Sequence, residues 1–188
     1  MHRFRLLGSL LTTGVLVAGS IAFTAPVAQA APPSGRLLIG DSVAGMNSAA
    51  LQARGFRVDY SVSRQFSALP SIMRSYGSRL PKNVIVHLGT NGYISASDCQ
   101  AAVKKAGSKR TVFFVTVRVP RAWEDANNAT LRACDKSFKG KRVQIIDWHK
   151  LSDKKSFWFY SDGYHPKESS GAIRYANLID KKVDKQGR

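Results

Sequence analysis

The sequence predicts one α/β domain with three layers, in which a parallel sheet lies between two layers of helices. Short apolar runs alternate with segments of helical apolar spacing, so that a strand and a helix follow each other five times along the chain. Two runs, Asn83–Gly89 and Thr111–Val117, are mainly apolar without strict alternation, which is typical of strands buried on both faces. No repeat or low-complexity linker interrupts this order. The predicted sheet therefore has five strands joined by right-handed crossovers.

The expected elements follow from these patterns in chain order. The strands are expected at Arg36–Gly40, Phe56–Val62, Asn83–Gly89, Thr111–Val117 and Arg142–Asp147. The helices are expected at Ala44–Ala53, Phe66–Tyr76, Ser97–Ala106, Trp123–Phe138 and Ser169–Val183. Pro70 lies inside the second helix, so this helix is expected to be broken or to start late. Loops that leave the carboxyl ends of parallel strands converge on one edge of the sheet, and ligands bind there.

The first 30 residues have the layout of a secretory signal peptide. Arg3 and Arg5 precede the apolar stretch Leu6–Phe23, and Ala28-Gln29-Ala30 fits the small-residue rule for cleavage. We expect cleavage after Ala30 and secretion of residues 31–188 as one monomeric domain, either extracellular or associated with the cell envelope. An uncleaved membrane anchor is the alternative, although this stretch holds many glycine, serine and threonine residues for a span.

The chain is strongly basic, with a formal charge of +17. The leader holds Arg3 and Arg5 and no acids, so the charge after cleavage is 17 − 2 = +15. Such a charge attracts polyanions, and for a secreted protein these are anionic polymers of the cell envelope. Improved solubility is the alternative explanation. Nucleic acid is not an expected partner, because no basic run is interleaved with aromatic residues and no nucleic-acid motif is present.

Cys99 and Cys134 are the only cysteines, and the sequence leaves their state open. Export permits a disulfide, which would stabilise the fold by roughly 3–4 kcal/mol. The expected topology places Cys99 near the carboxyl edge and Cys134 near the opposite edge, more than about 7 Å apart, which is too far to bridge.

Two loops at the carboxyl edge carry residues suited to acyl transfer. Ser42 follows the first strand at a helix N-terminus, where backbone N–H groups stabilise a developing oxyanion. Asn91 lies between Gly89 and Gly92 after the third strand, and its neutral amide is a suitable oxyanion donor. Taken separately, Ser42 would be only a helix cap and Asn91 only a turn residue.

The segment Ser161–Pro166 supplies a base and its partner. A serine hydroxyl needs an imidazole to remove its proton, and the imidazole needs a carboxylate to fix its tautomer. Asp162 and His165 are close enough for one loop to present both. His87 and His149 lack a comparably placed acid, so we interpret them as structural. No cluster of three or four ligands supports a metal site, and no cofactor is expected.

With these residues in place, the sequence resembles the SGNH hydrolase superfamily, the GDSL-type esterases. "GDSV" around Ser42, "GTNG" around Asn91 and "DGYHP" around His165 match three of the family's sequence blocks in order and spacing. The stretch Val115–Lys136 further resembles the extracellular SGNH domain of membrane acyltransferases that O-acetylate peptidoglycan and other envelope glycans. The resemblance implies a flavodoxin-like sheet with strand order 2-1-3-4-5. It also implies Ser42 as nucleophile, His165 as general base and Asp162 as its orienting carboxylate, with Asn91 and the Ser42 N–H in the oxyanion hole.

One family block departs from this pattern. The second block normally supplies a glycine whose N–H faces the oxyanion, whereas the loop after the second strand here reads "SVSRQF". A backbone N–H of Ser63 or Arg64 is the expected substitute. Arg64, Arg118 and Trp123 are expected to contact the substrate.

The expected substrate is a small ester or an acylated glycan with a short acyl group. We expect a secreted esterase that removes O-acetyl groups from envelope glycans without a metal or organic cofactor. An O-acyltransferase is the alternative within the same chemistry, because only the attacking nucleophile differs. A non-catalytic protein that binds the envelope through its basic surface is the alternative of another class.

Overall fold

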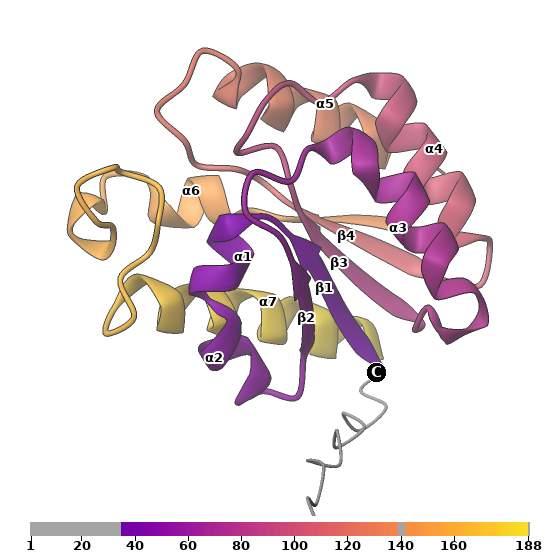
Figure 1. Cartoon of the computed structure of the whole chain (residues 1–188), viewed down its shortest axis with the longest axis horizontal. Helices are drawn as coiled ribbons and strands as arrows, with labels where there is room; N and C mark the ends of the chain where they lie inside the picture. The colour runs from indigo at the N-terminus through magenta and orange to yellow at the C-terminus, as the bar shows by residue number, and fades with distance from the viewer. Residues whose placement is uncertain (1–34, 139–141, 188) are drawn as a thin grey trace, which may run out of the picture. The chain divides into compact units, whose positions relative to one another are not determined.

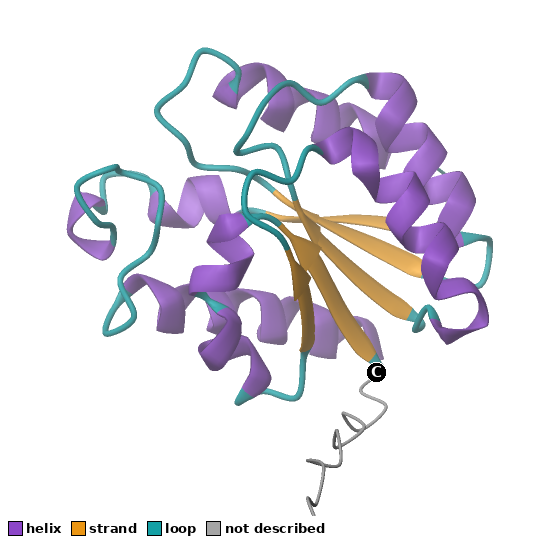
Figure 2. Ribbon diagram, viewed as in Figure 1, coloured by secondary structure: helices purple, strands orange, loops and turns teal. Residues whose placement is uncertain are grey.

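A five-stranded parallel sheet lies at the centre of the computed structural model, which describes residues 35–138 and 142–187 (Figure 2). The strands are β1 (Arg36–Gly40), β2 (Arg57–Tyr60), β3 (Asn83–His87), β4 (Thr111–Val115) and β5 (Val143–Ile146). Their order is β2-β1-β3-β4-β5 and every pairing is parallel, so the predicted fold class and strand order are confirmed. The expected leader lies outside the described residues.

Helices cover both faces of the sheet (Figure 1). One face carries α3 (Leu69–Tyr76), α4 (Ala96–Ala106) and α5 (Glu124–Ser137). The other carries α1 (Ser42–Met46), α2 (Ser48–Gln52), α6 (Trp148–Ser152) and α7 (Gly171–Gly187). Short 3₁₀ turns occur at Phe66–Ala68, Gly77–Arg79 and Ser156–Trp158. Within the described residues, no helix combines the length and apolar character needed to cross a membrane.

The strands bury both faces, as their continuous apolar sequences predict. In β1, Leu37 and Ile39 pack beneath α3 and α4, while Leu38 packs beneath α1 and α7. All three side chains are fully buried. Because side chains alternate along a strand, each central strand contributes to both hydrophobic cores. These two cores fix the sheet, whose carboxyl edge then presents the loops.

Several element boundaries differ from those expected. The first expected helix is divided into α1 and α2 at Asn47, and α6 and the 3₁₀ turns were not expected. The strands β2 and β3 end earlier than expected because their last residues turn into the loops of the carboxyl edge. The expectation for the Pro70 helix is confirmed, since α3 begins late, with Pro70 in its first turn.

Cys99 and Cys134 form a disulfide, and their Cα atoms are 6.3 Å apart. The expectation that the two cysteines lie too far apart to bond was therefore wrong. That expectation holds only if α4 and α5 begin level with each other. In the structure the first turns of α5 lie beside the loop that precedes α4, where Asn127 contacts Ile94. This offset brings the third turn of α5 level with the first turn of α4, and the two cysteines meet.

Candidate active site

Ser42, His165 and Asp162 form a hydrogen-bonded chain at the carboxyl edge of the sheet. His165 Nε2 lies 2.9 Å from Ser42 Oγ. On the other side of the ring, His165 Nδ1 lies 2.8 Å from Asp162 Oδ2. The side chain of His165 is 21% exposed, so the chain is reachable from solvent and still partly sheltered. The geometry is that of a nucleophile, a base and a carboxylate that orients the base.

The backbone holds each of these groups in place. Asp41 caps α1 by accepting the Val43 N–H at 3.0 Å, which places Ser42 at the helix N-terminus directly after β1. In the other loop, Asp162 Oδ1 accepts the N–H groups of Tyr164 and His165, both at 3.0 Å. Asp162 therefore both shapes the turn and contacts the ring that the turn presents.

The same hydrogen bonds keep Asp162 ionised. Partial burial alone would raise the pKa of its carboxyl group, but the backbone N–H groups of His165 and Tyr164 and the His165 ring outweigh this and lower the pKa below its ordinary value. A carboxylate in this state accepts a hydrogen bond from Nδ1–H of His165. That tautomer leaves Nε2 free to accept the Ser42 proton.

Asn91 presents an unused amide beside the same edge. Its Nδ2 atom is buried and has no hydrogen-bond partner among the described residues. Its backbone oxygen accepts a hydrogen bond of 2.7 Å from Gln65 Nε2, which ties the loop after β3 to the loop after β2. At Gly92, with φ of 153°, an added Cβ would lie 2.7 Å from Gln65 Oε1, so this turn requires glycine. Buried donors are rarely left unpaired, so this amide is available to a ligand oxygen.

Ser63 and Arg64 lie in the loop that lacks the family's glycine. Ser63 has a φ of 59°, the left-handed conformation that glycine adopts most readily. The Arg64 guanidinium donates to the Gly40 and Asp59 carbonyls at 3.2 and 2.9 Å and to the Asp59 carboxylate at 2.9 Å. Tyr76 donates to the other Asp59 oxygen at 2.8 Å. Arg64 is predicted to contact substrate, and in the structure these bonds fix its loop to the ends of β1 and β2.

Arg118 and Trp123 follow β4 in different settings. Arg118 donates to the Ser152 carbonyl at 2.9 Å and lies over the Phe159 ring, so it connects this loop to α6 and does not extend freely toward Ser42. Trp123 donates to the Thr90 carbonyl at 3.3 Å, next to Asn91. Its ring lies 5.8 Å from that of Tyr93, which is 67% exposed. Trp123 and Tyr93 therefore form an aromatic pair beside the candidate oxyanion donor.

Beneath Ser42 lie buried polar groups. Burial raises the pKa of Asp41 to about 6, although the hydrogen bond from the Val43 N–H opposes the rise. Burial lowers the pKa of His87 to about 3, so its ring is neutral, and its Nδ1 lies 2.7 Å from the Tyr175 hydroxyl. This neutral, buried state agrees with the structural interpretation of His87.

Asn127 and Asn128 were not among the predicted site residues. Both are buried in the second turn of α5. Asn127 donates to the Gly89 and Gly92 carbonyls at 2.9 and 2.8 Å and accepts the Ile94 N–H at 2.7 Å, so it holds both ends of the Asn91 loop. The periodicity of α5 contained a signal. Asn127 lies one turn before Leu131 and two turns before Cys134 on the face that is expected to be buried, and a buried amide needs hydrogen-bond partners.

Glu124 and Asp125 of α5 and His149 of α6 bring their ligand atoms within 4.8 Å of one another. The Glu124 carboxylate already accepts the Val119 N–H and lies 2.9 Å from His149 Nε2. These contacts tie the loop after β4 to α6, which gives His149 a structural role.

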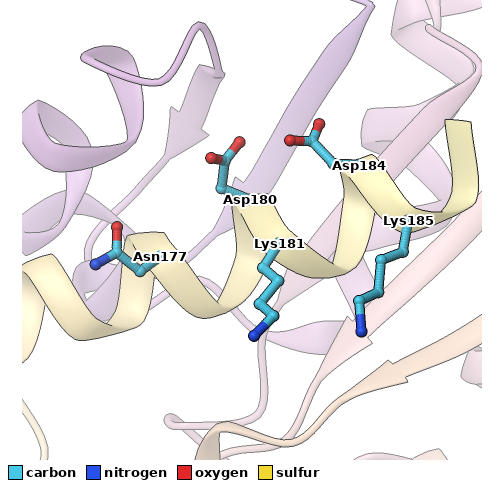
Figure 3. A pocket seen from close by; sticks show the side chains of 5 residues that line it. All are labelled: Asn177, Asp180, Lys181, Asp184 and Lys185. Carbon is cyan, nitrogen blue, oxygen red and sulfur yellow. The ribbon is translucent and has the colours of Figure 1, made fainter.

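A concave surface along α7 lies far from this edge. It is lined by Asn177, Asp180, Lys181, Asp184 and Lys185, and in Figure 3 the two aspartates point away from the two lysines. Asp180 and Asp184 bind Arg36, the first residue of β1, at the amino edge of the sheet. The two carboxylates therefore have a structural role. None of the five lining residues is a serine, cysteine or histidine.

The chain is similar in sequence to O-acetyltransferases of the bacterial envelope. No family model matches it. The Bacillus subtilis protein YrhL, a candidate peptidoglycan O-acetyltransferase, is 34% identical over 133 residues, which are 69% of this chain and 20% of that protein. The chain thus spans a fifth to a quarter of the length of the curated relatives that it matches.

Two solved structures are similar over nearly their full length. The C-terminal catalytic domain of Streptococcus pneumoniae peptidoglycan O-acetyltransferase A superposes with a TM-score of 0.71 at 24% identity, over 81% of this chain and 93% of that one. A GDSL-like lipase of Bacteroides thetaiotaomicron superposes with a TM-score of 0.62 at 16% identity, over 84% of this chain and 92% of that one.

Proposed function

Since this chain has the fold of the solved O-acetyltransferase catalytic domain and GDSL-like lipase, we propose that it is a secreted serine esterase that removes short acyl groups, acetyl above all, from glycans of the cell envelope. The observation that carries the proposal is the Ser42–His165–Asp162 chain, with distances of 2.9 and 2.8 Å. The unpaired Asn91 amide and the sequence likeness to envelope O-acetyltransferases support it. The likeness also supports an enzyme of acyl-ester chemistry more generally, whichever nucleophile completes the reaction.

The proposed reaction has two steps. Ser42 Oγ attacks the ester carbonyl carbon while His165 Nε2 takes its proton, and the oxyanion is held by Asn91 Nδ2 and the Ser42 N–H. His165 then returns the proton to the departing sugar oxygen, which leaves an acyl group on Ser42. In the second step His165 Nε2 takes a proton from water, whose oxygen attacks the acyl carbon. The bond between that carbon and Ser42 Oγ then breaks as His165 returns the proton to Oγ, which frees the carboxylic acid and regenerates Ser42. The Ser63 N–H is the proposed third oxyanion donor, because Ser63 adopts the conformation expected of the missing glycine.

The aromatic pair Trp123 and Tyr93 supports a sugar as the substrate's alcohol part. Exposed aromatic rings have apolar faces that pack against the C–H groups of sugar rings, and the Trp123 N–H is already engaged by Thr90. The pair lies next to Asn91, where it could orient an O-acetyl group toward Ser42.

Transfer to a sugar hydroxyl is the second candidate. The observation that favours it is the name of the relatives, which are O-acetyltransferases. The acyl-enzyme is common to both reactions, so the active-site geometry is compatible with either.

The test of the proposal is turnover of para-nitrophenyl acetate by the purified chain. We expect Ser42→Ala to lower kcat by about 10⁴-fold or more, since the nucleophile is lost while the fold is retained. Equal rates for the two proteins would exclude the esterase and favour the non-catalytic envelope-binding protein. A chito-oligosaccharide acceptor, with O-acetylated product followed by mass spectrometry, separates transfer from hydrolysis.

A further inference from the structure

Basic side chains gather at the amino edge of the sheet, opposite the catalytic loops. In a parallel α/β fold, the strands begin and the helices end at this edge. The helices α3 and α4 run side by side and end there, and α5 packs on α4 (Figure 1). We call the nine cations at these helix ends and strand starts the basic edge: Arg74, Arg79, Lys82, Lys104, Lys105, Lys109, Arg110, Lys136 and Arg142.

Two arginines build this surface into the fold. Arg110 donates to the Leu80 and Ala106 carbonyls at 2.8 and 3.0 Å, and Arg142 donates to the Val103 and Gly107 carbonyls at 3.3 and 3.2 Å. These bonds satisfy the last carbonyls of α4 and place positive charge at the negative end of its dipole. The other seven cations of the basic edge are exposed.

The positive charge of the basic edge is largely unbalanced, since Asp135, beside Lys136 in the last turn of α5, is set against nine cations. Within the described residues none of its nine cations forms an ion pair, whereas Arg36, Arg64 and Arg132 elsewhere each bind a carboxylate. Between Asp59 and Glu124 the only acidic residue is Asp98, which lies in the first turn of α4 at the opposite edge. A surface of this kind concentrates a flexible polyanion by releasing its counterions.

We propose that the basic edge binds a linear polyol phosphodiester, a polymer whose phosphates carry the charge and whose backbone carries no rings. The exposed apolar side chains favour this partner over two others. They are Met46, Tyr60, Val62, Tyr93, Leu151, Phe157, Tyr160 and Ile173, and none lies at the basic edge. The half-buried rings of Tyr76 and Phe138, at the ends of α3 and α5, are covered by the guanidinium groups of Arg57 and Arg142. Among the described residues, nucleic-acid bases would therefore find no free stacking surface there, and a lipid bilayer would find no exposed apolar side chain to insert among its acyl chains.

Binding through this edge leaves the catalytic edge free. The polymer contacts the ends of α3, α4 and α5, while Ser42 lies at the other end of the strands. The phosphodiester thus retains the protein at an envelope surface with its active site turned toward a second molecule. This inference does not depend on the proposed chemistry, because the basic edge shares no residue with the candidate active site.

The test compares two triple variants of equal net charge. One removes three lysines of the basic edge, as Lys104→Gln, Lys105→Gln and Lys109→Gln. The control removes three exposed lysines that follow β5, as Lys150→Gln, Lys154→Gln and Lys155→Gln. Affinity for poly(glycerol phosphate) is measured by calorimetry between about 50 and 200 mM salt, with circular dichroism to verify the fold.

We expect the basic-edge variant to bind about tenfold more weakly and with a shallower salt dependence, while the control changes less than about threefold. Equal losses in the two variants would overturn the proposal, since binding would then follow net charge alone. Tighter binding by the unmodified chain to single-stranded DNA or to anionic phospholipid vesicles, at matched phosphate concentration, would overturn the choice of partner. Turnover of para-nitrophenyl acetate is recorded in parallel, so that a failure of the esterase proposal is seen separately.

Discussion

At the scale of single residues, the buried and unpaired amide of Asn91 is the proposed oxyanion donor. We expect Asn91→Ala to lower kcat by about 10²- to 10³-fold with little change in KM, because the amide acts on charge that develops only in the transition state. Steady-state kinetics with para-nitrophenyl acetate measure the effect. Ser63→Gly provides the comparison, since it keeps the backbone N–H and suits a φ of 59°, and it should remain within about threefold of the original rate. A large loss in Ser63→Gly with none in Asn91→Ala would reverse these assignments.

The raised pKa of Asp41 predicts that the free energy of unfolding depends on pH. Its pKa is about 6 in the folded chain and 3.8 in the unfolded chain, so the folded state binds the proton more tightly. Its contribution to stability is present below pH 4 and is lost as the pH rises through 6. We expect this loss to reach about 3 kcal/mol, and Asp41→Asn removes the titration while keeping a residue able to cap α1.

Urea unfolding at pH 4 and pH 7 tests this difference. Relative to the unsubstituted chain, the unfolding free energy of Asp41→Asn should rise by about 2.4 kcal/mol between pH 4 and pH 7, because part of the full loss already occurs below pH 4. A difference that stays constant with pH would show that Asp41 has no raised pKa. Other carboxylates titrate equally in both proteins and cancel in the comparison.

The sequence predicted that Ser42, His165 and Asp162 come together because each stands in a short local motif. Ser42 follows a strand, Asn91 lies between two glycines, and Asp162 and His165 share one loop. The contacts of Arg64 with Gly40 and Asp59 could not be predicted, because the pairing of β1 with β2 brings these groups beside it. Local sequence does not show whether a cation near a site points toward the substrate or binds the backbone of neighbouring strands.

At the scale of elements, α5 supports the Asn91 loop through Asn127. We expect Asn127→Ala to lower the unfolding free energy by about 2–4 kcal/mol, because it leaves the Gly89 and Gly92 carbonyls and the Ile94 N–H unpaired. It should also lower kcat, since the loop that presents Asn91 loses its anchor. Urea unfolding and ester turnover measure the two effects.

Asn128→Ala is the matched control. Asn128 is also buried on α5, but it binds the N–H and carbonyl of Val117, at 2.8 and 2.9 Å, and not the Asn91 loop. Its replacement should cost similar stability with a smaller loss of kcat. If both variants lose activity in proportion to stability, Asn127 has no separate effect on the site.

At the scale of the whole molecule, the sequence predicted the five strands and their layering because apolar runs report burial directly. It did not predict how far α5 is displaced along α4, since that offset depends on Asn127 reaching a loop that precedes another helix. It also missed α6, whose five residues are too few for a periodic pattern. Strand order came from the resemblance and not from the residues themselves.

The disulfide gives a prediction for global stability. Cys99 and Cys134 are 35 residues apart, and closing a loop of this length should raise the unfolding free energy by about 3–4 kcal/mol. We expect guanidinium unfolding with a reductant present to show this loss. The double variant Cys99→Ala and Cys134→Ala should unfold identically with and without reductant. A reductant effect that persists in the double variant would point to another cause.

The offset of α5 links redox conditions to the quality of the catalytic centre. Cys134 and Asn127 lie on the same helix, α5. The disulfide that restrains the third turn of α5 therefore also restrains the turn whose Asn127 is hydrogen-bonded to the Asn91 loop. Protein produced in the reducing cytoplasm of a host would lack this disulfide. Low esterase activity of such protein would therefore first indicate a missing disulfide and not an incorrect assignment of the catalytic residues.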